Sequence, residues 1–118
     1  MTSSIRARSW AVVAISAAIG AALRWAAVGL IGDRPGLLLC NVLGCGVIGY
    51  AVGQSSGPWL TAGLCGALTS CSAIALQVAV DFDAGHYATA VGWLLATVVL
   101  GGAVFSASTR LIPPGAHR

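Results

Sequence analysis

The sequence predicts an all-α membrane protein of four transmembrane helices. Of its 118 residues, 58% are hydrophobic and only 8% are charged. A soluble domain carries about 25% charged residues, so this chain could not cover a folded surface with polar side chains. Four apolar windows are long enough to cross a bilayer, which needs roughly 20 apolar residues per helix. We therefore expect a single four-helix membrane domain over residues 1–118.

The four spans are defined by apolar runs that end at helix-breaking residues. The breakers are "GDRPG" at 32–36, "QSSGP" at 54–58, "DFDAGH" at 81–86 and "IPPG" at 112–115. The expected spans between them are about 10–31, 36–53, 59–80 and 87–108. Because the loops are short, neighbouring helices should run antiparallel, which places both termini on one side of the membrane.

The arginines are distributed unequally across the membrane. The side with the termini holds Arg6, Arg8, Arg110 and Arg118, and the other side holds Arg34 with Asp33, Asp81, Asp83 and His86. By the positive-inside rule, both termini are expected in the cytoplasm of a bacterium, with the chain in its plasma membrane. The net charge of +3 forms no basic stripe with interleaved aromatics, so we expect no nucleic-acid partner.

Four cysteines lie inside the apolar stretches, at Cys40, Cys45, Cys65 and Cys71. Their spacing is not C-x-x-C, which argues against a zinc or redox pair. We interpret them as small packing residues in the membrane, with soft-metal transport as the alternative. Pairs of small residues four apart, such as Gly49 with Gly53, could pack within the chain or against a second subunit.

Several polar residues lie inside the expected spans, where each is a candidate for function. Arg24 could snorkel to the interface or attract anions at a pore mouth. Asn41 could form an interhelical hydrogen bond or donate its amide N–H groups to an anion. The stretch "GALTSCSAIALQ" at 66–77 could be a continuous helix with self-bonded hydroxyls, or a broken helix with exposed carbonyl and N–H groups. We expect a break at 66–69, near the middle of the membrane.

We expect no Asp or Glu inside any span. A proton-coupled exporter needs a group that titrates within the membrane, and multidrug transporters of similar size depend on a membrane Glu. The chain contains no Glu at all. Hydrogen-bond donors without a titratable partner favour passive passage of a small anion.

Three segments then resemble the small fluoride channel family of the Fluc (CrcB) type. They are "GAALRW" at 20–25, "GLLLCNVLGCGVIG" at 36–49 and "GLCGALTSCSAIALQ" at 63–77, and the resemblance extends over all four spans in order. It implies a channel rather than an enzyme, an antiparallel dimer with two fluoride pathways, and a broken third helix. It also implies a structural sodium ion at the dimer centre.

The resemblance assigns roles to individual residues. Asn41 matches the pore asparagine, Arg24 the vestibule arginine, and Ser72 the hydroxyl between two pore phenylalanines. Gly66 and Thr69 match the positions whose backbone carbonyls hold the sodium ion. On the fourth span, Thr97 and Trp93 look like the family's serine and the aromatic residue one turn earlier. The expected ion pathway therefore comprises Arg24, Asn41, Ser72 and Thr97.

The sequence departs from the family at the aromatic half of this site. Cys71 and Ile74 stand where the two phenylalanines are expected, and they lack ring edges with partial positive charge. Ser70, Ala67 and Gln77 replace a Thr, a Gly and a Glu.

These departures bear on the expected partner and function. Together with the unequal arginines, they predict a heterodimer with an inverted homologous subunit rather than a homodimer. We expect passive fluoride export from the cytoplasm. The alternatives are a non-conducting scaffold subunit that completes a partner's pore, and a small four-helix drug or metal transporter.

Overall fold

The computed structural model is entirely helical over the residues it describes, which are 2–54 and 56–112. The helices are α1 (Thr2–Ile31), α2 (Asp33–Val52), η1 (Trp59–Cys65), α3 (Gly66–Leu68), α4 (Cys71–Asp83) and α5 (Tyr87–Thr109). Four stretches are long and apolar enough to cross a membrane: Arg6–Ile31, Asp33–Val52, Trp59–Asp83 and Tyr87–Thr109. The prediction of a four-helix, multi-pass membrane protein is therefore confirmed.

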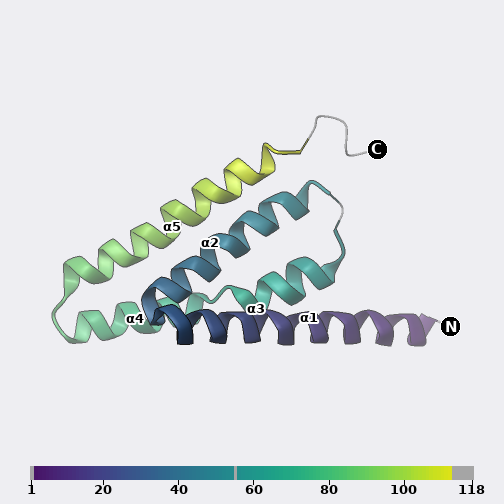
Figure 1. Cartoon of the computed structure of the whole chain (residues 1–118), viewed down its shortest axis with the longest axis horizontal. Coiled ribbons are helices and arrows are strands. Elements are labelled where there is room, and N and C mark those ends of the chain that lie inside the picture. Colours follow the sequence, from purple (N-terminus) through teal and green to yellow (C-terminus); the bar gives the residue numbers. More distant parts are fainter. Residues whose placement is uncertain (1, 55, 113–118) are drawn as a thin grey trace.

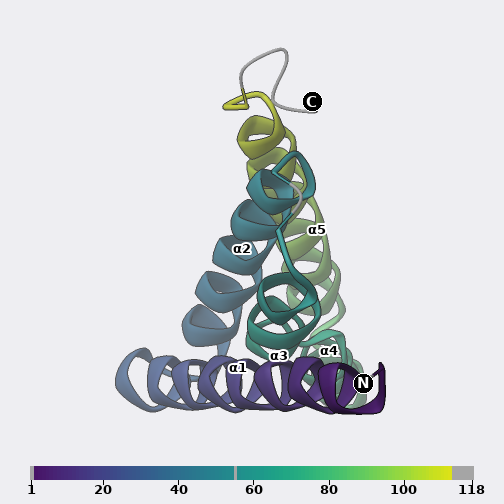
Figure 2. The same cartoon turned by 90° about the vertical axis from the view of Figure 1, so that its right-hand side faces the viewer.

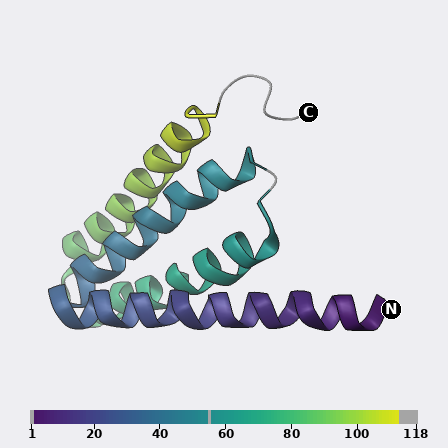
Figure 3. The same cartoon turned by 45° about the vertical axis from the view of Figure 1, so that its right-hand side comes forward.

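The helices diverge instead of forming a parallel bundle. In Figure 1, α1 runs along the bottom, α2 rises from its C-terminal end, and α5 rises beside α2 from the end of α4. In the view of Figure 2, α2 and α5 lean together above α1, which runs along the bottom. Figure 3 shows η1 and α3 lying between α1 and α2. The closest packing joins α2 to α5 and α1 to η1, whereas α4 packs mainly against α5.

The first turn is much shorter than expected. The predicted breaker at 32–36 is reduced to Gly32, because α2 already begins at Asp33. Gly32 has φ 94°, a left-handed conformation that suits glycine and reverses the chain in one residue. Pro35 lies in the first turn of α2, where the first N–H groups have no helical acceptor anyway, and Gly36 donates the next bond to the Gly32 carbonyl.

Other helix ends also differ from the predicted spans. α1 begins at Thr2, before the apolar window expected from 10, and α4 continues through Asp83 rather than ending at 80. Asp81 and Asp83 therefore lie at the end of the third stretch and Asp33 begins the second, so our expectation that the spans contain no acidic residue was wrong. α5 ends at Thr109, and the predicted "PPG" stop at 113–115 lies outside the described residues, as does Arg118.

Small residues hold α2 against α5 and η1 against α1. A Cβ on Gly49 would lie 2.6 Å from the Phe105 carbonyl oxygen of α5. A Cβ on Gly63 would lie 2.9 Å from the Val13 carbonyl oxygen of α1. Side chains at these positions would push the helices apart, so both glycines serve packing within the chain. Cys40 and Cys65 are buried, as expected of small packing residues, but Cys71 is exposed.

Candidate functional site

The third membrane-spanning stretch is broken at Thr69 and Ser70. Both residues are extended, with φ −84° and ψ 151° at Thr69, and φ −150° and ψ 102° at Ser70. The helix before the break is also irregular, because the Gly66 N–H bonds to the Thr61 carbonyl five residues earlier, as in a π-helix. The break predicted at 66–69 is present at the end of that range, while Gly66 itself remains helical.

Side chains compensate for the backbone bonds lost at the break. The Cys65 carbonyl accepts hydrogen bonds from the N–H and the hydroxyl of Thr69, each at 3.0 Å. The Ser70 hydroxyl accepts from the Ala73 N–H at 3.2 Å and so caps the start of α4. The Ser70 N–H, which would bond the Gly66 carbonyl in a continuous helix, instead donates to Asn41 at 2.8 Å. Polar side chains thus stabilise this break in an apolar environment.

Asn41 is the central residue of the site. It lies on α2 and is only 6% exposed. An N–H donor requires the oxygen of the amide as its acceptor, so the bond from Ser70 orients Asn41 with Oδ1 toward the break. Its Nδ2 is buried and has no hydrogen-bond partner among the described residues. Two N–H donors are therefore held in place and free to bind an acceptor or an anion.

A hollow of about 610 Å³ lies on the side of α4 that faces α1, and Arg24 and Ser72 line it. Asp33, Ser70 and Gln77 also line it. The hydroxyls of Ser70 and Ser72 are 3.3 Å apart and share a hydrogen bond. The structure therefore brings Arg24 and Ser72 together, and it adds the carboxylate of Asp33, which the sequence analysis placed only at a loop.

On the opposite side, α4 and α5 form an apolar groove of about 460 Å³. Cys71, Ile74 and Thr97 line it together. Thr97 Oγ1 already donates to the Trp93 carbonyl at 3.0 Å, so its hydroxyl proton is engaged within the helix. The two positions that lack phenylalanine therefore face the residue expected on the fourth span, but the groove has few polar groups.

The predicted sodium residues lie on the other side of the break from α4. Gly66 is exposed, and no described residue donates a hydrogen bond to its carbonyl or to that of Thr69. No group of three His, Cys, Asp or Glu side chains is arranged to hold a metal ion in the described part of the chain. A cation there would depend on carbonyl oxygens at the C-terminal end of α3, where the helix dipole is negative.

The ion pair between Arg34 and Asp81 was missed by the sequence analysis. Arg34 Nη2 donates to Asp81 Oδ1, and Asp81 is 4% exposed. These residues are 47 positions apart and belong to different breaker segments. No periodicity or motif in the sequence links them, so only the tertiary structure could reveal the pair.

Comparison with known proteins places this architecture in a family. The model of the CrcB-like protein family (Camphor Resistance, CrcB) matches residues 11–109. "Fluoride-specific ion channel FluC 2" of Parasynechococcus marenigrum is 37% identical over 111 residues, covering 87% of this chain and 83% of that protein. The protein of the same name from Synechococcus sp. is 36% identical over the same shares. "Fluoride-specific ion channel FluC" of Paracoccus denitrificans is 35% identical over 101 residues, covering 75% of this chain and 81% of its own length. The chain therefore belongs to the CrcB-like family.

Proposed function

We propose that this chain is a subunit of a channel through which fluoride leaves the cytoplasm passively. The choice of fluoride as the ion rests on the names of the three relatives, each of which is called a fluoride-specific ion channel. The observation that carries the proposal is the buried Asn41, whose amide nitrogen is oriented by the break and has no hydrogen-bond partner among the described residues. Fluoride is small and strongly hydrated, so a narrow path must replace its water with strong donors. Asn41, Ser72 and Arg24 are such donors.

Passive conduction is enough for detoxification. Fluoride enters a cell as the neutral acid and ionises at cytoplasmic pH, so a selective anion path lowers its concentration without coupling to another gradient. Within the stretches that could span a membrane, Asp81 is paired with Arg34, Asp33 is the first residue of α2 and Asp83 is the last residue of α4, so no unpaired acid lies in the middle of a span. This favours a channel over a proton-coupled drug or metal transporter.

A structural sodium ion is part of the same proposal. The carbonyls of Gly66 and Thr69 would hold it, because neither accepts a hydrogen bond from the described residues. Hard cations prefer oxygen ligands, and a single chain offers too few here. The ion would therefore bind between two subunits and stabilise the dimer.

The partner in the proposed dimer is an inverted homologous subunit rather than a second copy. Four arginines against one across the membrane favour a single orientation of this chain, with both termini cytoplasmic in a bacterial plasma membrane. Cys71 and Ile74 themselves offer an anion no aromatic ring edge, and the aromatic residue of this apolar groove, Phe82, lies in the last turn of α4 against Tyr87. A partner that carries Phe at these two positions would supply the missing half of a pathway.

Fluoride efflux from liposomes tests the proposal. The chain is reconstituted alone and with a Phe-bearing family member from the same organism, and efflux is recorded with a fluoride electrode without a proton gradient. We expect efflux from the pair and little from this chain alone. Efflux from the pair that is unchanged by Asn41→Asp in this chain would identify this chain as a non-conducting scaffold, and obligatory proton exchange would identify a transporter. Efflux from this chain alone, with C-terminal reporters on both membrane sides, would refute the heterodimer.

A further inference from the structure

Helix α4 is held against α2 at both of its ends. At its start, Asn41 Oδ1 accepts the Ser70 N–H at 2.8 Å. At its end, Arg34 donates to Asp81. Both anchoring side chains belong to α2, and α4 otherwise packs mainly on α5. Arg34 therefore completes a two-point attachment whose other point is the Asn41 site itself.

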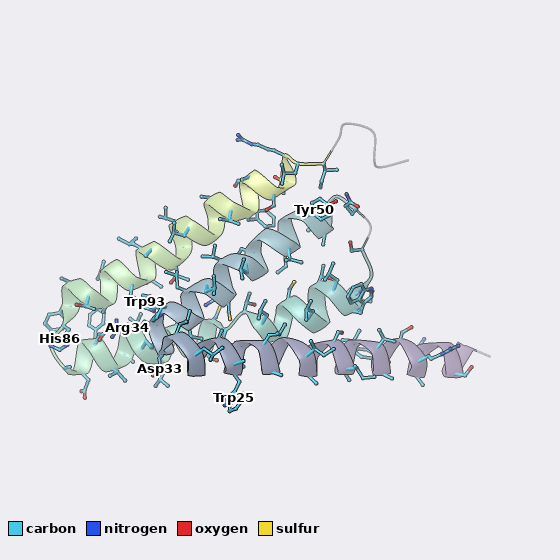
Figure 4. The ribbon with its side chains drawn as sticks, viewed as in Figure 1. Trp25, Asp33, Arg34, Tyr50, His86 and Trp93 are labelled. Carbon is cyan, nitrogen blue, oxygen red and sulfur yellow. The ribbon has the colours of Figure 1, made fainter. Side chains whose placement is uncertain are left out.

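The second attachment point is a half-buried polar cluster, in which Asp81 is buried and Arg34 reaches the surface. Asp81 is 4% exposed, and its Oδ2 has no hydrogen-bond partner among the described residues. The guanidinium carbon of Arg34 lies 5.8 Å from the centroid of the Trp93 ring, within range of a cation–π contact. Figure 4 shows Arg34 and Trp93 near the end of the α4–α5 hairpin, with His86 at its tip. One side chain of α2 thus contacts both α4 and α5.

Asp81 is placed where it controls the rotation of α4. It follows Ile74 by seven residues, about two helical turns, so both side chains leave α4 on the same side. Both side chains are buried, with exposures of 8% for Ile74 and 4% for Asp81. A fixed Asp81 therefore fixes the direction in which Ile74 points.

The rotation of α4 matters because the helix separates two hollows. Ser72 and Gln77 line the hollow that contains Arg24, whereas Cys71 and Ile74 line the groove toward α5. Successive residues of an α-helix are about 100° apart, so a modest rotation would move these side chains out of their hollows.

We propose that Arg34 and Asp81 are positioning residues that set the rotation of α4 and thereby assign its side chains to the two hollows. The inference rests on the proposed function only for its effect on fluoride flux. Without the ion pair, α4 loses its attachment to α2 at its end and keeps its packing on α5 and the attachment to α2 at the break. The end of α4 then turns, and Ile74 leaves its buried position.

Alkylation of an engineered cysteine tests the rotation directly. Ile74→Cys is introduced as a reporter, and the purified protein in detergent is treated with a small maleimide, with each site quantified by peptide mass spectrometry. Asp81→Asn is compared with the matched control Asp83→Asn, which removes an exposed acid two residues away. Native Cys45, half-buried on α2 and therefore outside the rotating helix, reports reagent activity, while Cys65, at 0% exposure, reports unfolding.

We expect Asp81→Asn to accelerate alkylation of the reporter about tenfold, and Asp83→Asn to leave it unchanged, with Cys65 unreactive in both. Asp81→Glu keeps the charge and should restore most of the protection. An unchanged rate in Asp81→Asn would overturn the proposal. Equal acceleration in Asp81→Asn and Asp81→Glu would also overturn it, because the size of the side chain and not its charge would then matter. Parallel reaction of Cys65 would overturn it as well, because that result indicates general unfolding.

Fluoride flux of the reconstituted complex separates this inference from the proposed function. Asp81→Asn should lower flux per folded complex about tenfold while the amount of folded protein stays the same, because displaced side chains lose their contacts with the ion. If the unmutated complex carries no fluoride and the alkylation pattern is still found, the proposed function fails and the positioning role stands.

Discussion

Replacing Asn41 by aspartate separates the two roles of its amide. The Oδ1 atom accepts the Ser70 N–H at 2.8 Å, and Nδ2 is buried without a partner. Aspartate is nearly the same size and keeps an oxygen acceptor toward Ser70. It removes the two N–H donors, and when ionised it repels an anion. Asn41→Asp should therefore preserve the break and abolish fluoride conduction.

The magnitudes follow from these contacts. A hydrogen bond to a charged group contributes about 1.5–3 kcal/mol. Since 1.4 kcal/mol corresponds to a factor of ten, losing the donors should lower flux about 10- to 100-fold even before charge repulsion is counted. Asn41→Ala removes the acceptor as well and leaves the buried Ser70 N–H unpaired, which should cost about 1–3 kcal/mol of stability.

The assay is fluoride efflux from liposomes, combined with thermal unfolding of the same preparations. Asn41→Asp should melt close to the unmutated protein and conduct little, whereas Asn41→Ala should melt lower and also conduct little. Flux at the unmutated level in a well-folded Asn41→Asp complex would remove the amide from the ion pathway. Equal loss of stability in both variants would refute the role of Oδ1 in holding the break.

Three further substitutions test the packing and the break. Gly66→Leu should leave the helix content of the chain unchanged, because among the described residues an added Cβ would meet within 4 Å only the Thr61 carbonyl oxygen, at 3.6 Å. It should disrupt the dimer in size-exclusion chromatography, because the added bulk blocks close approach of a second subunit. Retained dimer and sodium dependence would argue against a close contact there. Gly49→Ala should lower the free energy of unfolding by about 1–3 kcal/mol, because its Cβ would meet the Phe105 carbonyl. The control Gly102→Ala meets no described atom within 4 Å and should be neutral or slightly stabilising. Equal melting temperatures of the two variants would contradict this. Ser70→Ala should lose about 1 kcal/mol of capping and accelerate hydrogen exchange in the first turn of α4, and unchanged exchange would show that the cap is dispensable.

The sequence by itself determined the membrane class and the number of spans. Hydropathy over some 20 residues is a local property, and a chain with so few charges has no alternative to lipid as its surroundings. The sequence also predicted the break in the third span, because Gly66, Thr69 and Ser70 bring flexibility and hydroxyls into an apolar helix. Arg24, Asn41 and Ser72 could be selected for the same reason, since polar groups are costly in a membrane.

The tertiary structure decided where the break lies and which residues share a hollow. Gly66 stays helical, and the break falls at Ser70 because Asn41, on another helix, accepts the Ser70 N–H. The assignment of Ser72 to one hollow and Ile74 to the other depends on the rotation of α4. Each of these features requires a contact between segments far apart along the chain, and local sequence patterns contain no information about such contacts.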